Sequence, residues 1–194
     1  MGIRFLALAL LASAACVSSP SVPDPGSGEP LPQVYADVLL NYTVGGEFGV
    51  CRKELPACEV PLDTPCDQAG DMPDALTVLG APDDALFTFD RDGRLDVGIH
   101  CGAITEAGPL IIHAIGSDLM HADVFVSLDG IYFTLIGDLV GPKPDAGPGE
   151  VSFTGSFSLT TYGFHSIRYV RLFDRSAAGM SIDSIEGTWS GDPE

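Results

Sequence analysis

The sequence predicts an all-β domain, built as an antiparallel sandwich or barrel, in a protein that is exported from the cell. Short segments of alternating apolar and polar residues recur from residue 34 onward, separated by glycine, proline and aspartate, which is typical of such folds. No stretch after residue 16 sustains the 3.6-residue period of an amphipathic helix. The export prediction comes from the first 15 residues.

These 15 residues have the three parts of a secretory signal peptide. Arg4 provides a positive charge, residues 5–11 form an apolar run, and small residues follow. A helix that crosses a bilayer needs about 20 apolar residues, and this run is much shorter. The pattern therefore favours a signal peptide over a buried core helix or a membrane-spanning helix.

Two cleavage sites compete at the end of the signal peptide. Ala12-Ser13-Ala14 fits ordinary signal peptidase, and cleavage there would give a soluble secreted protein. Ser13-Ala14-Ala15-Cys16 resembles the lipobox of bacterial lipoproteins, with Ser13 where leucine is usual. In that family the cysteine becomes the first mature residue and carries acyl chains such as palmitate.

The cysteine count favours the lipobox. The chain has five cysteines, and an odd number in an exported protein leaves one thiol over. We therefore expect a lipid on Cys16 that attaches the protein to a membrane. Val17 follows it, and by resemblance to the sorting rule of enteric bacteria this residue directs a lipoprotein to the outer membrane, facing the periplasm or the surface.

Two further segments differ from the predicted sandwich, which spans residues 34–190. Residues 16–33 are rich in proline, glycine and serine and are expected to be a flexible tether. Residues 51–70 are a cysteine-rich insertion that we expect disulfides to pin in an oxidising compartment. The four cysteines concerned allow three pairings, and the sequence does not choose among them; they are Cys51, Cys58, Cys66 and Cys101.

The net charge excludes one class of partner. The chain carries a formal charge of −18 at pH 7, and such a field repels nucleic acids and anionic lipid headgroups. No nucleic-acid partner is expected.

Nine segments have the pattern of strands. Asp92-Gly93 and Asp129-Gly130 predict tight hairpin turns between the segments that flank them, because these dipeptides supply the positive φ that such turns need. The segments are 35–44, 86–89, 95–100, 110–115, 123–128, 131–136, 151–159, 167–173 and 180–186.

Three details of these strands can also be predicted. Residues 110–115 are continuously apolar and residues 167–173 alternate strongly, so both are expected to be central strands. In the last segment the alternation slips between Ile182 and Ile185, which predicts a β-bulge.

Four motifs follow one another from Leu79 onward and resemble those of jelly-roll modules in bacterial cell-surface proteins and, more distantly, of galactose-binding-like (discoidin-type) sandwiches. The resemblance covers about 110 residues by inspection and implies a jelly-roll sandwich. Such modules also carry an acidic glycine-rich segment before the hairpin, which residues 107–113 lack. The motifs are Leu79-Gly80-Ala81-Pro82-Asp83, Val126-Ser127-Leu128-Asp129-Gly130-Ile131-Tyr132-Phe133, Ile167-Arg168-Tyr169-Val170-Arg171-Leu172 with Asp174, and Ser181-Ile182-Asp183-Ser184-Ile185-Glu186.

One candidate calcium site lies in the predicted hairpin around Gly93. Asp90, Asp92 and Asp96 place three carboxylates on a short loop, and calcium takes six to eight oxygen ligands. The alternative is a polar turn without a metal, since the bidentate glutamate of an EF-hand loop is missing.

A second candidate calcium site is implied by the resemblance to galactose-binding-like folds. In these folds an early loop and the last strand approach each other and often hold a structural calcium. The corresponding residues are Asp83, Asp84 and Glu186. The alternative is a solvated loop.

The aromatic residues divide into a candidate ligand site and the core. Tyr162, Phe164 and His165 lie in a predicted loop before the 167–173 strand, and loops often bind ligands. The alternative is a loop without a ligand. Large aromatic residues on alternating strands usually fill the core, as expected for Tyr42, Tyr132 and Trp189.

No catalytic motif is present. The sequence lacks G-x-S-x-G, a P-loop and H-E-x-x-H, and the cysteine spacing does not fit a zinc site. We therefore expect a non-catalytic exported lipoprotein whose sandwich serves surface recognition or a structural role, with a glycan or protein partner. The alternatives are a calcium-stabilised carbohydrate-binding module and, with less support, a glycan-active enzyme with paired carboxylates.

Intact-mass analysis of the membrane-extracted protein checks the predictions for the cysteines. We expect a mass that begins at Cys16 with added acyl chains, and an increase on reduction that corresponds to two disulfides. A mass that begins at Ala15 without acyl chains would contradict lipidation.

Overall fold

The structure is a computed structural model that describes residues 32–43, 75–89, 91–99, 102–142, 150–176 and 179–190. The signal peptide, Cys16, nearly all of the tether and the insertion with its cysteines lie outside the described residues, as does Cys101. Among the residues that are described, no helix is long and apolar enough to span a bilayer.

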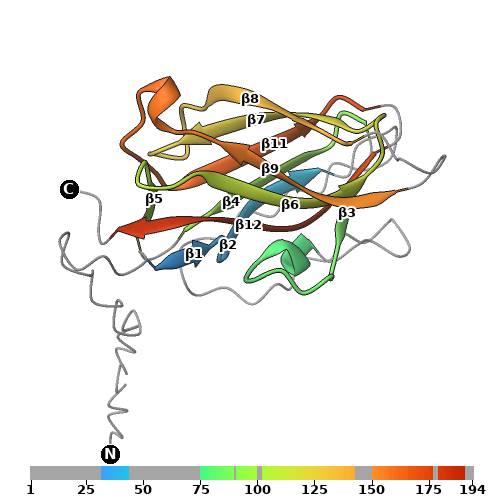
Figure 1. The fold of residues 1–194 in the computed structure, drawn as a ribbon, viewed down its shortest axis with the longest axis horizontal. Coiled ribbons are helices and arrows are strands. Elements are labelled where there is room, and N and C mark those ends of the chain that lie inside the picture. The colour runs from blue at the N-terminus through green and yellow to red at the C-terminus, as the bar shows by residue number, and fades with distance from the viewer. Residues whose placement is uncertain are drawn as a thin grey trace, which may run out of the picture.

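Two antiparallel sheets make up the domain (Figure 1). The five-stranded sheet has the order β2 (Val38–Thr43), β4 (Arg94–Gly98), β11 (Tyr169–Asp174), β7 (His121–Ser127) and β8 (Thr134–Val140). The seven-stranded sheet has the order β10 (Ser166–Ile167), β5 (Ala103–Thr105), β12 (Met180–Ser190), β6 (Leu110–Gly116) and β9 (Val151–Phe157).

Two further strands pair with β12. β1 (Gln33–Tyr35) and β3 (Phe87–Phe89) both pair with it, so the first and last strands lie side by side (Figure 1). Two short 3-10 helices, η1 (Ala75–Val78) and η2 (Thr160–Tyr162), complete the elements of the described part.

Alternation of side chains places one core between the two sheets. In β6 and β7 every second residue is buried, because successive side chains of a strand point to opposite faces. Val124 and Leu172 from the five-stranded sheet join the same buried cluster as Ile112 and Ile185 from the other. This confirms the predicted class, an all-β antiparallel sandwich of the jelly-roll kind.

Three predicted details are confirmed. β11 occupies the middle of the five-stranded sheet, and β6 lies between β12 and β9, so both are central strands. β12 has a register shift between Ile182 and Ser184, inside the interval where the sequence predicts a bulge.

The hairpin predicted at Asp92-Gly93 is wrong. β3 pairs with β12 in one sheet, whereas β4 pairs with β2 and β11 in the other, so this turn crosses between the sheets. Asp92 has the expected left-handed backbone, with φ 64°. Its amide donates to the carbonyl of Asp174 at 3.1 Å, and the amide of Asp174 donates to the carbonyl of Gly93 at 2.9 Å. The turn therefore bonds to the end of β11 instead of closing a hairpin.

The second predicted hairpin exists, but its turn is longer than the sequence predicts. β7 ends at Ser127 and β8 begins at Thr134, so residues 128–133 form a loop, called the 128–133 loop below. Gly130 has the expected positive φ, 73°. Residues 131–133 were predicted to begin the second strand, but they remain in the loop because the amides of Ile131 and Tyr132 donate to the Asp129 carboxylate.

Candidate functional site

Asp96 is the central residue of the candidate site. Its neighbours Leu95 and Val97 point into the core, so its carboxylate projects from the outer face of the five-stranded sheet. The residue is nevertheless only 3% exposed, because two arginine side chains cover it. A buried carboxylate of this kind is stable only when it is paired and hydrogen-bonded.

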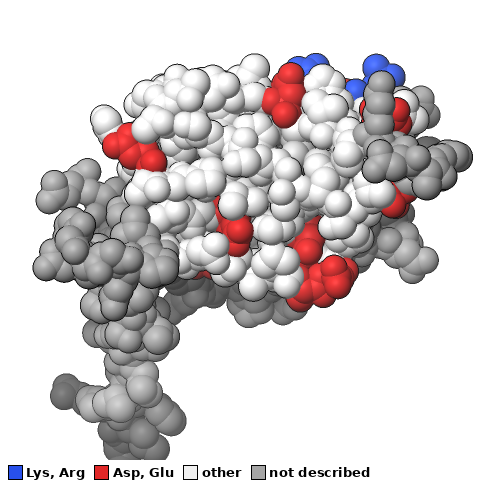
Figure 2. Space-filling view, in the orientation of Figure 1, with Lys and Arg blue, Asp and Glu red and all other residues white. Residues whose placement is uncertain are grey.

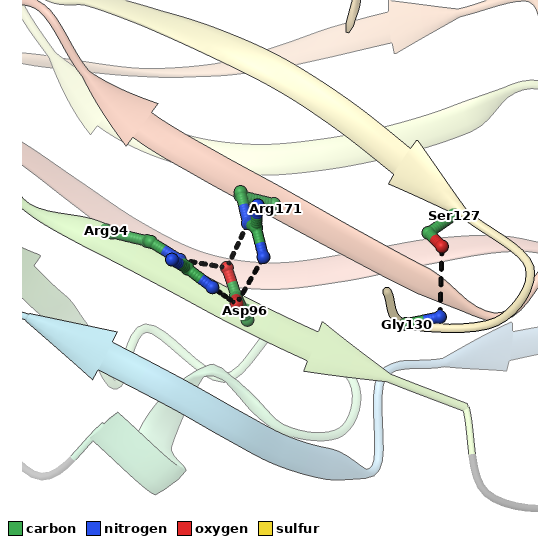
Figure 3. Close-up of polar contacts among 5 residues, drawn as sticks. All are labelled: Arg94, Asp96, Ser127, Gly130 and Arg171. Atoms are coloured by element: carbon green, nitrogen blue, oxygen red, sulfur yellow. Dashed lines mark hydrogen bonds and ion pairs between the residues drawn. The ribbon is translucent and has the colours of Figure 1, made fainter. Parts of the chain in front are cut away.

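Arg171 and Arg94 supply that pairing (Figure 3). Arg171 lies opposite Asp96 on β11, and its Nε and Nη2 donate to Oδ1 and Oδ2 at 2.8 and 3.0 Å. Arg94 Nε donates to Oδ1 at 2.8 Å, and its Nη2 donates to Oδ2. The hydrogen bond to Asp96 raises the pKa of Arg94, although burial acts in the opposite direction. Both carboxylate oxygens are thus shared by two guanidinium groups.

Arg171 also holds one end of the 128–133 loop. Its guanidinium carbon lies 3.6 Å from the ring centroid of Phe133, the last residue before β8. A guanidinium over an aromatic face gains cation–π attraction, which is larger where water is excluded. Because Nε and Nη2 of Arg171 are both bonded to Asp96, the guanidinium plane offers Phe133 a rigid surface.

Short-range hydrogen bonds hold the beginning of the loop. Ser127 Oγ accepts from the amide of Gly130 at 2.9 Å (Figure 3) and donates to Asp129 Oδ1 at 2.9 Å. The same Asp129 oxygen accepts from the amides of Ile131 and Tyr132 at 2.8 and 2.9 Å. Asp side chains often organise turns in this way. The amide of Tyr132, then that of Ile131, lowers the pKa of the Asp129 carboxyl, because both bonds favour its charged form.

The two restraints leave an apolar tip exposed between them. Tyr132 is 80% exposed, Ile131 is 73% exposed and Leu128 is about half exposed, as is Leu135 on the adjoining strand β8. Tyr132 was predicted to belong to the core, and the structure corrects this, whereas Tyr42 and Trp189 are buried as expected. Large apolar side chains that are clustered and exposed on a soluble surface often mark an interaction site.

The structure separates the three residues predicted to bind a ligand. Tyr162 is in η2 and half exposed. Its hydroxyl lies close to Gly137 of β8. Phe164 packs against the core. The His165 ring is exposed, and its Nδ1 lies 2.9 Å from Glu106 Oε1. Of the three, Tyr162 and His165 therefore have exposed rings, and Phe164 does not.

The first predicted calcium set is also divided. Asp96 is committed to Arg94 and Arg171, Asp92 is exposed in the turn, and Asp90 lies outside the described residues. In the second set, the amide of Asp83 donates to Asp183 Oδ1 at 3.1 Å, and Asp84 is exposed with φ 65°.

Glu186, the third member of the second set, has other neighbours. Its Oε1 lies 3.2 Å from His113 Nε2. The pKa of the Tyr35 hydroxyl is raised by burial, then by the charge of Glu186 and a hydrogen bond to it. Calcium at either predicted set therefore stays a prediction.

Acidic groups do not form a single patch on the face seen in Figure 2, where they appear as separate spots among uncharged residues. Lysine and arginine side chains appear only at one margin of this view. The acidic composition is thus spread over this face rather than concentrated in one binding site.

Comparisons with known proteins give a likeness of fold only. No protein-family model matches the sequence, and no curated protein matches it. Two solved structures are modules CBM32-3 and CBM32-1 of a family 31 glycoside hydrolase from Clostridium perfringens, with TM-scores of 0.46 and 0.43 and identities of 9% and 13%. They cover 61% and 62% of this chain and 85% and 87% of the modules.

A third solved structure is a family 29 carbohydrate-binding module from Piromyces equi. Its TM-score is 0.36 and its identity is 12%, over 56% of this chain and 72% of the module. At TM-scores below 0.5 these three likenesses support no statement about what this chain binds.

Removing the Asp96 carboxylate should destabilise the domain much more than breaking an exposed pair. Asp96→Ala leaves two arginines facing each other, and we expect the free energy of unfolding to fall by roughly 2–4 kcal/mol. This is less than the full cost of breaking a wholly buried pair, because both arginines are partly exposed. Urea unfolding measures this loss. Glu106→Ala, which breaks the exposed pair with His165, is the control and should cost less than about 1 kcal/mol. Equal losses would show that Asp96 is not a special constraint.

The order of the 128–133 loop should depend on pH through Asp129. The folded pKa of this carboxyl lies below its ordinary value of 3.8. The stabilisation that its hydrogen bonds give the loop is therefore fully present above pH 3.8 and is lost as the pH falls through the folded pKa. Amide NMR signals of Ile131 and Tyr132 should therefore titrate together with a midpoint below 3.8. Asp129→Asn should abolish that step, and a midpoint above 3.8 in the unaltered protein would contradict the hydrogen-bond assignment.

Proposed function

We propose that this chain is a non-catalytic, exported lipoprotein whose sandwich recognises a neutral glycan through the 128–133 loop. The observation that supports this most is the combination of a nearly fully exposed Tyr132 with a loop that is held at both ends. Binding residues are often on loops that a rigid scaffold positions. A loop whose backbone is held in place loses less conformational entropy when it binds than a mobile loop does.

The chemistry beside Tyr132 suits a sugar. The aromatic ring offers an apolar face with a polar hydroxyl at its edge. Asp129 Oδ1 is occupied by loop amides, and the residue is exposed to solvent. An ionised carboxylate oxygen accepts hydrogen bonds strongly, and sugar hydroxyls donate them. Ring stacking and hydroxyl recognition are therefore available side by side.

The charge of the protein restricts the glycan. A net charge of −18 repels polyanions such as sulfated or uronic-acid glycans. The absence of a catalytic motif in the sequence supports binding rather than cleavage. The proposed lipid on Cys16 and the tether over 16–33 would hold the sandwich away from an outer membrane, so that the loop could reach its partner.

A glycan array with the detergent-extracted full chain tests the proposal. We expect binding to one group of neutral glycans, and Tyr132→Ala should weaken it about tenfold or more, as at a typical interface hot spot. Tyr162→Ala is the matched control, a half-exposed tyrosine on η2, and should change the affinity less than about twofold. Both variants should unfold at the same temperature as the unaltered protein, because both rings are largely outside the core.

Two outcomes would overturn this proposal. Unchanged glycan binding by Tyr132→Ala would remove the loop as the binding site. Release of shortened glycans from the array would show that the protein is an enzyme.

A further inference from the structure

A second group of side chains lies on the outer face of the five-stranded sheet, toward the end of β7 that is opposite the 128–133 loop. His121 and Asp123 alternate on β7, and Asp138 lies directly opposite Asp123 on β8. Alternate residues of a strand share a face, so the three side chains converge. One ligand atom from each lies within 4.8 Å of the other two.

The spacing fits metal ligands better than a hydrogen bond. His121 Nε2 lies 3.6 Å from Asp138 Oδ2, beyond ordinary hydrogen-bond length. Two ligands bound tetrahedrally to zinc at about 2.0–2.1 Å are separated by roughly 3.3 Å. The Nε2 atom is itself buried and has no hydrogen-bond partner within the described structure. A buried imidazole nitrogen without a partner is costly unless something binds it.

The charges around these residues also favour a cation. Two carboxylates directly opposite on neighbouring strands repel each other. Arg175 Nε donates to Asp123 Oδ2 at 2.8 Å and its guanidinium carbon lies 4.8 Å from the centroid of the Phe173 ring. Arg175 therefore orients Asp123 and leaves Oδ1 for a ligand bond, as hydrogen-bonded groups around metal sites commonly do.

We propose that His121, Asp123 and Asp138 bind a divalent transition-metal ion such as Zn²⁺. One imidazole nitrogen and two carboxylate oxygens suit zinc and its neighbours, whereas calcium prefers oxygen ligands only. The side chains of His121 and Asp138 are about half exposed, so the proposed site lies at the surface and a water can complete the coordination of the ion. The bound ion would join the edge strand β8 to β7.

This site is independent of the proposed glycan site. Asp123 lies four positions before Ser127, where β7 ends and the loop follows, which is about 13 Å at 3.3 Å per residue. Either proposal can therefore fail while the other holds.

Calorimetry with Zn²⁺ and the chelator-treated, oxidised full chain in detergent tests the proposal. We expect one ion per chain, a thermal midpoint that rises on binding, and visible absorption bands when Co²⁺ replaces zinc. His121→Gln and Asp138→Asn should each weaken binding at least tenfold. His165→Gln is the matched control, because His165 also faces a carboxylate, Glu106, at 2.9 Å but lacks a third ligand in the described structure.

The result that would overturn the proposal is equally definite. Zinc binding that His121→Gln and Asp138→Asn leave unchanged, or no binding at millimolar zinc, would exclude this site. Loss of binding in His165→Gln alone would place the ion at the His165–Glu106 pair and would also contradict the proposal.

Discussion

The Asp96 carboxylate is the constraint on which the rest of the site depends. It projects from the face of the sheet that is turned away from the core, yet it is almost completely covered. Two guanidinium groups pair with the buried carboxylate. The two hydrogen bonds from Arg171 to Asp96 fix the Arg171 side chain in one orientation. Phe133 then rests on a plane that cannot turn. The Asp96–Arg171 ion pair thus fixes the end of the 128–133 loop through Phe133, while the hydrogen bonds of Ser127 and Asp129 fix its beginning.

An apolar pair at these positions could stabilise the sheet as well or better, since buried ion pairs often gain little over well-packed hydrophobic residues. Such an apolar pair would not hold Phe133 in the orientation that the Arg171 guanidinium gives it. A leucine in place of Arg171 would offer Phe133 a rounded and mobile surface, whereas a guanidinium held by a bidentate carboxylate is flat and directional. The ion pair thus contributes position more than stability, and position is what a displayed aromatic ring needs.

The sandwich itself could be predicted from the sequence, because alternation within each strand reports which side chains enter the core. The bulge in β12 was predictable for the same reason. The partner of each strand was not: Asp92-Gly93 has the composition of a hairpin turn, but its amide and carbonyl bond to the end of β11. The 128–133 loop was missed because the residues after Asp129 also alternate like a strand. The sequence does contain a local indication of the loop. An aspartate can accept hydrogen bonds from the amides two and three positions later, as Asp129 does, and these amides are then not available for strand pairing.

The strongest features of this face come from pairs that are far apart in sequence. Asp96 and Arg171 are 75 residues apart, and Asp123 meets Asp138 only through the register in which His121 pairs with Val140 at one end and Val124 with Gly137 at the other. A shift of that register by one residue would turn Asp138 into the core. A register shift between Val124 and Phe125 separates this part of the ladder from the pairs next to the loop, Phe125–Leu135 and Val126–Thr134. The convergence of His121, Asp123 and Asp138 and the start of β8 at the loop therefore depend on two registers, one on each side of this irregularity. Ile136 and Leu139 are three residues apart and both buried, which an extra residue in the strand allows.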